Sequence, residues 1–311
     1  MDPDAVVEQV RTGGLLAPGA PVVVLLSGGR DSVCLLDVAV RVAGAGAVAA
    51  VHVNYGLRDE AGGDERHCAA LCAALGVELV VERAGEPAGN VQAWARELRY
   101  AAAERVAAAR DGDAGARGAP PASIAAGHTA DDQVETILYR LAAAPSRRAL
   151  LGMRPREGRL VRPLLELTRE QTTAYCEARG LAWRDDATNA GGRYARNRVR
   201  NELLPTFRAI HPAAEANVLT LARLLREEGE LLDALVDAEL DAGRSIALDR
   251  LAALRPALRR LVVQRLADDA AGRPVGGAAG RAEQVAALRP AGTAWLDLGG
   301  GVRAVAGYGV V

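Results

Sequence analysis

The feature of this sequence that most constrains its fold is a six-residue segment between an apolar run and the start of a helix. The apolar run 22–26 predicts a buried strand, and residues 27–32 (Ser-Gly-Gly-Arg-Asp-Ser) follow it directly. Two glycines let a backbone approach an anion closely, and the free amides at a helix start favour a phosphate there. An ordinary strand-to-helix turn has the same outline, so the segment alone predicts a strand, a loop with room for a phosphate, and a helix.

Two common nucleotide-binding loops are excluded. The chain has no lysine, because all 38 of its basic residues are arginine, and the Walker-type loop G-x-x-x-x-G-K-[ST] requires one. The dinucleotide fingerprint G-x-G-x-x-G is also missing after this strand. Ser27 and Ser32 add hydroxyl donors to the loop. Asp31 suits a polyphosphate only where Mg²⁺ lies between the two.

Apolar runs alternate with amphipathic helical patterns through the first half of the chain, which predicts an α/β fold with a parallel sheet covered on both faces. With 311 residues, 50% of them hydrophobic, the chain is long enough for one larger and one smaller domain. Ligands of such sheets gather at the carboxyl ends of the strands. The predicted strands are 22–26, 47–53, 77–81 and 122–126, and the predicted helices are 32–43, 64–75, 90–109 and 131–142, with a loop over 111–121.

Acidic residues gather where another predicted strand turns into a helix. The segment 127–136 carries His128, Asp131, Asp132 and Glu135 at this turn. Acids at a helix start usually cap the helix and compensate its dipole. Because this turn and the loop 27–32 share one edge of the predicted sheet, a second interpretation is that these side chains hold Mg²⁺ or orient and deprotonate an attacking amine.

Arginine-rich segments interrupt a chain whose formal net charge is only −1. Residues 140–162 carry seven Arg against one Glu, and residues 193–208 carry five Arg against one Glu. On the predicted helix 90–109, Arg96 and Arg99 share a broad face. Such runs are often solvated faces, and the alternative is a cationic surface that meets nucleotide or nucleic acid.

The cysteines and the chain start favour a cytosolic protein. No C-x-x-C pair occurs, and the acidic first residues lack the character of a signal peptide. His67, Cys68 and Cys72 would share a helix, but no fourth metal ligand is near them in sequence. We expect no membrane span, because apolar stretches of about 18 residues without charges or turn formers are missing.

Taken in order along the chain, these motifs resemble those of the tRNA(Ile)-lysidine synthases. The loop 27–32 matches the S-G-G-x-D-S loop of the ATP pyrophosphatases without a departure. Residues 184–189 (Arg-Asp-Asp-Ala-Thr-Asn) and 193–200 (Arg-Tyr-Ala-Arg-Asn-Arg-Val-Arg) are similar to the family's most specific motif. Tyr55 and Thr129 stand where histidine is common, and residues 142–146 replace a Gly-rich stretch. The resemblance is dense over residues 20–210 and loose over 211–311, as in a short form of the family.

The resemblance implies a fold and a reaction. The fold would be a Rossmann-like parallel sheet of the adenine nucleotide alpha hydrolase type, forming a PP-loop ATP pyrophosphatase domain over residues 1–208. A smaller, mainly helical domain over residues 209–311 would bind tRNA. The enzyme would be a ligase that uses ATP and Mg²⁺ to adenylate the wobble cytidine of tRNA(Ile) with a CAU anticodon. L-lysine would then displace AMP to form lysidine, and a homodimer is left open.

The same resemblance implies residue roles. Asp31 and Asp132 would hold Mg²⁺, and Asp31, Asp131, Asp132, Glu135 and His128 would carry the chemistry. The ATP-binding residues would be Ser27, Gly28, Gly29, Arg30, Asp31 and Ser32, and the substrate-binding residues Arg96, Arg99, Arg193, Arg196, Asn197, Arg198 and Arg200.

Three alternative functions remain on sequence grounds. A tRNA thiolase with the same loop would use activated sulfur and generally carries paired cysteines, which this chain lacks. A small-molecule ATP pyrophosphatase would not need the Arg-rich second half. A non-catalytic RNA-binding protein on the same scaffold would have lost ATP binding.

Overall fold

The computed structural model describes residues 2–57, 61–87, 89–116, 118, 120–143, 150–184, 195–240, 245–288 and 293–311. The chain divides into two compact units, Met1–Ala222 and Arg223–Val311. The predicted domain boundary lies after residue 208, whereas this division falls within helix α10 (Ala214–Asp237).

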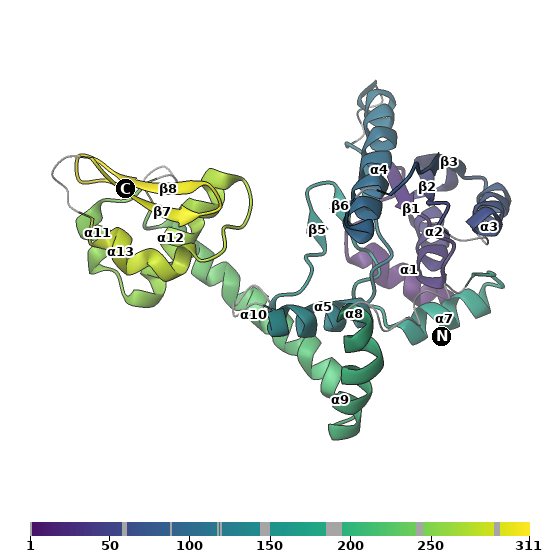
Figure 1. The fold of residues 1–311 in the computed structure, drawn as a ribbon. Coiled ribbons are helices and arrows are strands. Elements are labelled where there is room, and N and C mark those ends of the chain that lie inside the picture. The colour runs from purple at the N-terminus through teal and green to yellow at the C-terminus, as the bar shows by residue number, and fades with distance from the viewer. Residues whose placement is uncertain are drawn as a thin grey trace. The chain divides into compact units, whose positions relative to one another are not determined.

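The first unit is built on a six-stranded sheet with the order β3-β2-β1-β4-β6-β5 (Figure 1). Every neighbouring pair is parallel except the edge pair β5 and β6, which is antiparallel. The predicted parallel sheet is therefore confirmed, with the edge hairpin as an addition. The strands are β1 (Val22–Leu25), β2 (Val48–Asn54), β3 (Glu78–Arg83), β4 (Ser123–Ala125), β5 (Arg156–Glu157) and β6 (Leu160–Val161).

Alternate residues of β1 face opposite helical layers. Val22 and Val24 pack in one core with four helices, while Val23 and Leu25 pack against α4 (Val91–Ala116) on the other face (Figure 1). Burial on both faces explains the unbroken apolar run of this central strand. The helices of the first layer are α1 (Pro3–Thr12), α2 (Arg30–Ala43), α3 (Ala61–Leu75) and α7 (Arg169–Ala178), and a short 3-10 turn η1 (Ala45–Ala47) precedes β2.

Helix α4 continues seven residues beyond its predicted end, so the predicted loop over 111–121 is wrong for residues 111–116. Glycine in a helix costs only about 1 kcal/mol relative to alanine, which neighbouring contacts offset. Asp111 supplies such contacts, because it accepts the N–H of Ala122 (2.8 Å) and lies 2.6 Å from the Arg159 guanidinium.

The arginine-rich segment that follows α7 packs against α5 (Ala130–Ala143). Val134 of α5 forms a small core with Val199 and Leu204. This core places the arginines of the segment beside the acidic start of α5. The segment comprises α8 (Ala195–Arg198), a π-helical turn η3 (Val199–Leu203) and α9 (Leu204–Ile210).

The second unit is mainly helical and ends in a two-stranded antiparallel sheet. One face of this sheet, with Leu298 and Ala304, packs in a core with Val262 and Val263 of α12. Among the described residues, no helix is both long enough and apolar enough to cross a membrane. The elements are α11 (Leu248–Ala253), α12 (Pro256–Ala271), η4 (Ala278–Arg281), α13 (Ala282–Ala286), β7 (Ala294–Gly299) and β8 (Val302–Ala306).

Candidate functional site

Residues 27–32, named the phosphate loop after their predicted role, follow β1 and include the first three residues of α2. The two serines, Ser27 and Ser32, close this loop. The Ser32 hydroxyl donates to the Gly29 carbonyl (2.8 Å) and accepts the N–H of Ser27 (3.2 Å). Gly28 has φ of 86°, a left-handed conformation that favours glycine. A Cβ at Gly28 would also lie 3.2 Å from the Cys68 sulfur. The loop therefore requires glycine at this position.

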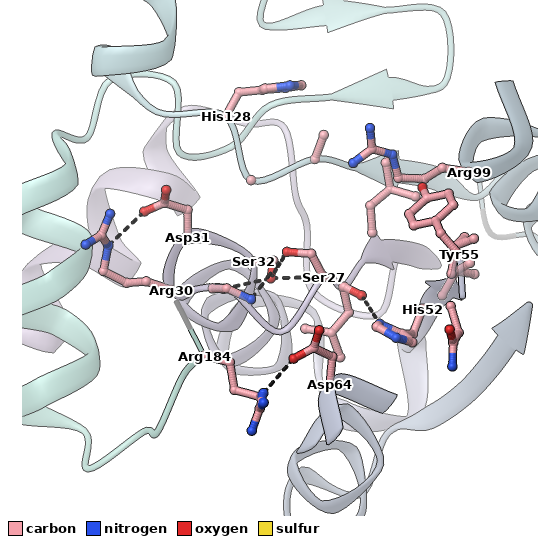
Figure 2. A pocket seen from close by; sticks show the side chains of 18 of the residues that line it. Ser27, Arg30, Asp31, Ser32, His52, Tyr55, Asp64, Arg99, His128 and Arg184 are labelled. Carbon is pink, nitrogen blue, oxygen red and sulfur yellow. Dashed lines mark hydrogen bonds and ion pairs between the residues drawn. The ribbon is translucent and has the colours of Figure 1, made fainter. Parts of the chain in front are cut away.

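A cavity of about 730 Å³ opens over the phosphate loop (Figure 2). Cavities of about 300–1,000 Å³ suit small-molecule ligands. The walls come from the carboxyl ends of β1, β2 and β4, where ligands of parallel sheets bind. The lining includes Ser27, Gly29, Arg30, Asp31 and Ser32, the segments 51–57 and 126–128, and Asp64, Arg99, Tyr100, Asp132, Arg169, Arg184 and Arg200.

The turn after β4 meets the phosphate loop backbone to backbone at Gly127. A Cβ at Gly127 would lie 2.9 Å from the carbonyl oxygen of Asp31 and 3.2 Å from the amide nitrogen of Ser32. Side chains do not fit at such distances, so only glycine permits this approach. The approach fixes the acid-bearing start of α5 beside the phosphate loop.

Asp31 offers a carboxylate oxygen that suits a magnesium ion shared with a nucleotide. Its Oδ1 accepts a hydrogen bond from Thr172 Oγ1 (2.6 Å) and lies 3.3 Å from Arg30 Nε. Its Oδ2 has no hydrogen-bond partner within the part of the chain that the structure describes. Mg²⁺ in such sites is held by one or two carboxylates, phosphate oxygens and water. The described residues contain no group of three or more His, Cys, Asp or Glu that would hold a metal alone, so phosphates would complete the ligand set.

Asp132 and Glu135 of α5 are paired with arginines of α8 and η3. Arg200 Nε lies 2.6 Å from Glu135 Oε1, and Arg196 Nε lies 3.1 Å from Oε2 of the same fully buried carboxylate. Asp132 Oδ1 lies 3.2 Å from Arg196 Nη2, and its Oδ2 accepts the N–H of Thr129 (2.9 Å). Burial raises the pKa of Asp132, but Arg196 and the Thr129 N–H outweigh burial and hold this pKa below its ordinary value.

Asp131, the third acid, is directed to α7. Its Oδ2 accepts the N–H of Arg169, the first residue of α7, at 2.7 Å. The Arg169 guanidinium lies 3.8 Å from Asp132 and 3.7 Å from Glu135. The three predicted acids therefore have different surroundings: Asp132 lines the cavity, Glu135 is buried among arginines, and Asp131 satisfies a free amide at the start of a helix.

The described arginines that the resemblance assigned to RNA differ in their ion-pair partners. Arg196 and Arg200 hold α8 and η3 against α5 through the carboxylates described above. Arg198 pairs with Glu202 at 3.3 Å, and both side chains are largely exposed. Asn197 lies on α8 between them, and Arg193 falls outside the described residues. A role of these residues in RNA binding stays a prediction.

His128 lies at the rim of the cavity with a buried nitrogen that lacks a partner. Its Nδ1 makes no hydrogen bond within the described structure. Burial is the main cause that lowers the pKa of His128; Asp132 opposes this effect, the nearby Arg162, Arg196 and Arg99 add to it, and the resulting pKa is about 4. The imidazole is therefore neutral at pH 7, when one of its ring nitrogens is free to accept a proton or a hydrogen bond.

Of the two arginines of α4 that were predicted to bind substrate, only one lines the cavity in the described structure. Arg99 lines the cavity, where Figure 2 shows it beside Tyr55, and its buried Nε has no partner among the described residues. Arg96 lies outside this lining, with its guanidinium 4.7 Å from the centre of the Tyr100 ring. A ligand in the cavity would therefore meet Arg99 and not Arg96.

Sequence reasoning missed two contacts of the phosphate loop. The N–H of Arg184 donates to the Gly28 carbonyl (3.0 Å), and its Nε lies 2.5 Å from Asp64 of α3 (Figure 2). The family motif flagged the segment that begins at Arg184 but suggested no role for this residue. Thr172, which contacts Asp31, gives no signal, since it is one polar residue of an amphipathic helix.

Comparison with known proteins matches this chain to a family and to a fold. The PP-loop domain model matches residues 8–207. A tRNA(Ile)-lysidine synthase of Symbiobacterium thermophilum is 37% identical, covering 98% of this chain and 67% of that protein. The enzyme of that name from Thermus thermophilus is 40% identical over 79% of this chain and 49% of that protein. This chain thus spans about half to two thirds of the length of the curated relatives it matches.

The fold also occurs in a solved tRNA-modifying protein. The U34-tRNA thiolase NcsA of Methanococcus maripaludis superposes with a TM-score of 0.57 at 16% identity, covering 72% of this chain and 78% of that one. At this identity, the likeness supports the α/β fold alone.

Proposed function

Because the chain belongs to the tRNA(Ile)-lysidine synthases, a family with the PP-loop domain, we propose that it ligates L-lysine to the wobble cytidine of tRNA(Ile) with a CAU anticodon. In the first step, the C2 carbonyl oxygen of the cytidine attacks the α-phosphorus of ATP and diphosphate leaves. In the second step, the ε-amine of lysine attacks C2, and AMP leaves with the oxygen. Adenylation is required because the carbonyl oxygen is otherwise a poor leaving group.

The observation that carries this proposal is that the phosphate loop and the acidic start of α5 open into one cavity. The loop suits the phosphates of ATP, and Asp132, His128 and Arg99 lie within the same lining. A nucleotide, a base and an amine would therefore meet without leaving this cavity. Holding reactants in one place is a large part of the rate enhancement in two-substrate reactions.

The phosphate loop supports the adenylation step. The two glycines allow close approach of the backbone to the phosphates, and the start of α2 favours negative charge. Asp31 would hold Mg²⁺ together with the phosphate oxygens, and the ion supplies charge neutralisation of the departing diphosphate. Asp132 is a weaker candidate ligand in this arrangement, because both of its oxygens already accept hydrogen bonds.

The acidic side of the cavity supports the amine step. A lysine ε-amine has an ordinary pKa of about 10.4, so it must lose a proton before it attacks. The carboxylate of Asp132 would attract the incoming ammonium group in competition with Arg196. The neutral His128 imidazole would accept a proton or orient the amine. Glu135 would act indirectly, by holding Arg196 and Arg200 in place.

The tRNA itself would be bound by exposed basic side chains such as Arg198 and by the second unit. Phosphate contacts of this kind position an RNA without reading its sequence. Such a substrate implies action in the cytoplasm. A homodimer stays a prediction that analytical ultracentrifugation would test.

The thiolase alternative finds no support in the cysteines of this chain. All four cysteines, Cys34, Cys68, Cys72 and Cys176, are buried, and none lines the cavity. A sulfur-transferring enzyme of this fold would need thiols within reach of the activated base.

The proposal is tested by incorporation of labelled lysine into an unmodified tRNA(Ile) transcript that bears CAU, with ATP and Mg²⁺. We expect ATP-dependent incorporation that an Asp31→Ala variant loses and that a transcript with uridine at the wobble position does not support. If the protein binds ATP but incorporates no lysine, the result would favour a small-molecule ATP pyrophosphatase or a tRNA thiolase. If the unaltered protein does not bind ATP, the result would favour a non-catalytic RNA-binding protein.

A further inference from the structure

Thr172 links helix α7 to the phosphate loop across 141 residues of sequence. Its hydroxyl lies 2.6 Å from Asp31 Oδ1, and the threonine side chain is fully buried. Buried polar groups are usually satisfied within their own element or by water. This hydroxyl also contacts, on another helix, the carboxylate that fits a magnesium ion.

The geometry indicates where the hydroxyl proton goes. Thr172 Oγ1 has two acceptors within reach, Asp31 Oδ1 at 2.6 Å and the Arg169 carbonyl oxygen at 3.0 Å. A hydroxyl carries one proton, and a hydrogen bond to a carboxylate is shorter and stronger than one to a neutral carbonyl. The proton therefore lies toward Asp31. Oδ1 of Asp31 is fixed by this bond, and Oδ2 is left without a hydrogen-bond partner in the described structure.

Helix α7 is itself held firmly, so the hydroxyl is a fixed donor. Thr168 and Gln171 form a reciprocal capping box at its start. In its middle, the fully buried Tyr175 donates its hydroxyl to Asp37 of α2, the helix that carries Asp31. The donor and the carboxylate thus stand on two helices that are tied together independently of their own contact.

We propose that Thr172 is a positioning residue for Asp31: it locks one carboxylate oxygen so that the other is presented to the magnesium ion of the bound nucleotide. This inference rests on the proposed ATP and Mg²⁺ site. Partners of this kind set ligand orientation, and their removal typically weakens metal affinity about 10- to 100-fold. Without the hydroxyl, Oδ1 would keep only Arg30 at 3.3 Å, and the carboxylate would turn toward that guanidinium.

The test compares Thr172→Val, which keeps the shape and removes the hydroxyl, with Thr172→Ser, which keeps the hydroxyl. Thr173→Val is the matched control, because among the described residues the neighbouring Thr173 hydroxyl bonds to the Arg169 carbonyl (2.8 Å) and not to Asp31. The readouts are ATP affinity by calorimetry at a series of Mg²⁺ concentrations, and Mn²⁺ binding to the ATP complex by electron paramagnetic resonance. Neither readout requires turnover.

We expect Thr172→Val to raise the Mg²⁺ and Mn²⁺ concentrations for half-saturation about tenfold, with ATP affinity in the absence of metal unchanged. Thr172→Ser and Thr173→Val should match the unaltered protein. If the metal concentration for half-saturation is unchanged in Thr172→Val while Asp31→Ala no longer responds to the metal, the role of Thr172 is overturned and the magnesium site at Asp31 stands. An unchanged metal dependence in Asp31→Ala would overturn the magnesium site of the proposed function itself.

Discussion

The carboxylate of Glu135 and the guanidinium of Arg200 meet in a two-point contact, with 2.6 Å from Oε1 to Nε and 3.0 Å from Oε2 to Nη2. Glu135 is fully buried, and Arg200 is partly exposed. The contact joins the helix that follows β4 to the arginine-rich segment some 65 residues later in the chain. We therefore expect this contact to stabilise the fold.

Replacing Glu135 with Gln should lower the free energy of unfolding by about 2–3 kcal/mol, because the guanidinium groups of Arg196 and Arg200, and the more distant one of Arg169, lose their buried counter-charge. Urea denaturation measures this change. The matched control is Glu202→Gln, which removes an exposed partner of Arg198 and should cost less than about 0.5 kcal/mol. Equal losses in the two variants would contradict the assignment of Glu135 as an anchor.

Replacing Gly28 with Ala should weaken ATP binding and lower the free energy of unfolding by about 1–2 kcal/mol, because alanine rarely adopts a left-handed backbone. The added Cβ would also crowd the Cys68 sulfur at 3.2 Å. Gly46→Ala is the control, since a Cβ there meets nothing within 4 Å. Calorimetric ATP titration and thermal unfolding provide the two measurements. A normal ATP affinity in Gly28→Ala would show that the loop does not hold the phosphates.

His128 should make the protein less stable as the pH falls from 6.5 to 4. Its pKa is lowered from 6.5 to about 4 in the folded state, so the unfolded chain binds the proton more readily over this interval. The free energy of unfolding should fall over this range by up to about 3 kcal/mol. Above pH 6.5 the contribution is constant.

The His128→Asn variant should lose this part of the pH dependence of the free energy of unfolding. The His211→Asn variant, altered at an exposed position, should retain it. Denaturation curves at half-unit pH steps, compared between the two variants, isolate the effect from the titration of carboxyl groups. Parallel curves for all three proteins would show that His128 is protonated as readily in the folded state as in the unfolded state.

Replacing Arg99 with Gln should lower kcat/KM for lysidine formation at least tenfold, because hydrogen bonds from charged groups contribute about 1.5–3 kcal/mol. Arg96→Gln, one turn away on the same helix but outside the cavity, should change kcat/KM less than about twofold. Steady-state kinetics with ATP, lysine and tRNA varied in turn would identify the substrate that Arg99 meets. A similar loss in both variants would indicate that the whole helix face binds the RNA.

The parts of the fold and site that depend on local pattern were predictable from the sequence. The apolar run of β1 indicated a strand buried on both faces, and Val22 to Leu25 indeed pack into two cores. The glycines of the loop were predicted to allow close approach of the backbone to an anion, and the structure adds that Gly28 adopts a φ of 86°. Local propensity also located α2 and α5, although α2 begins at Arg30, two residues earlier than predicted.

The parts that depend on which residues meet across the chain were not predictable. An arginine pattern does not reveal which carboxylates the side chains contact, so the ion pairs of Arg196 and Arg200 with the buried Glu135 were not foreseen. The Thr172 hydroxyl is polar by sequence and functional only by its distance to Asp31. The extension of α4 to Ala116 was missed, because glycines that mark loops by composition are tolerated within a supported helix.

Gly127 has a consequence for anyone who would redesign this protein to accept another amine. Since a Cβ at this position would lie 2.9 Å from the Asp31 carbonyl oxygen and 3.2 Å from the Ser32 amide nitrogen, no side chain at position 127 sets the spacing between the nucleotide side of the cavity and the acceptor side. The residues around the incoming amine can therefore be exchanged while the distance from the activated base to the phosphates stays the same. A library that varies the acceptor wall should leave position 127 untouched, because any other residue there would separate the two reacting partners.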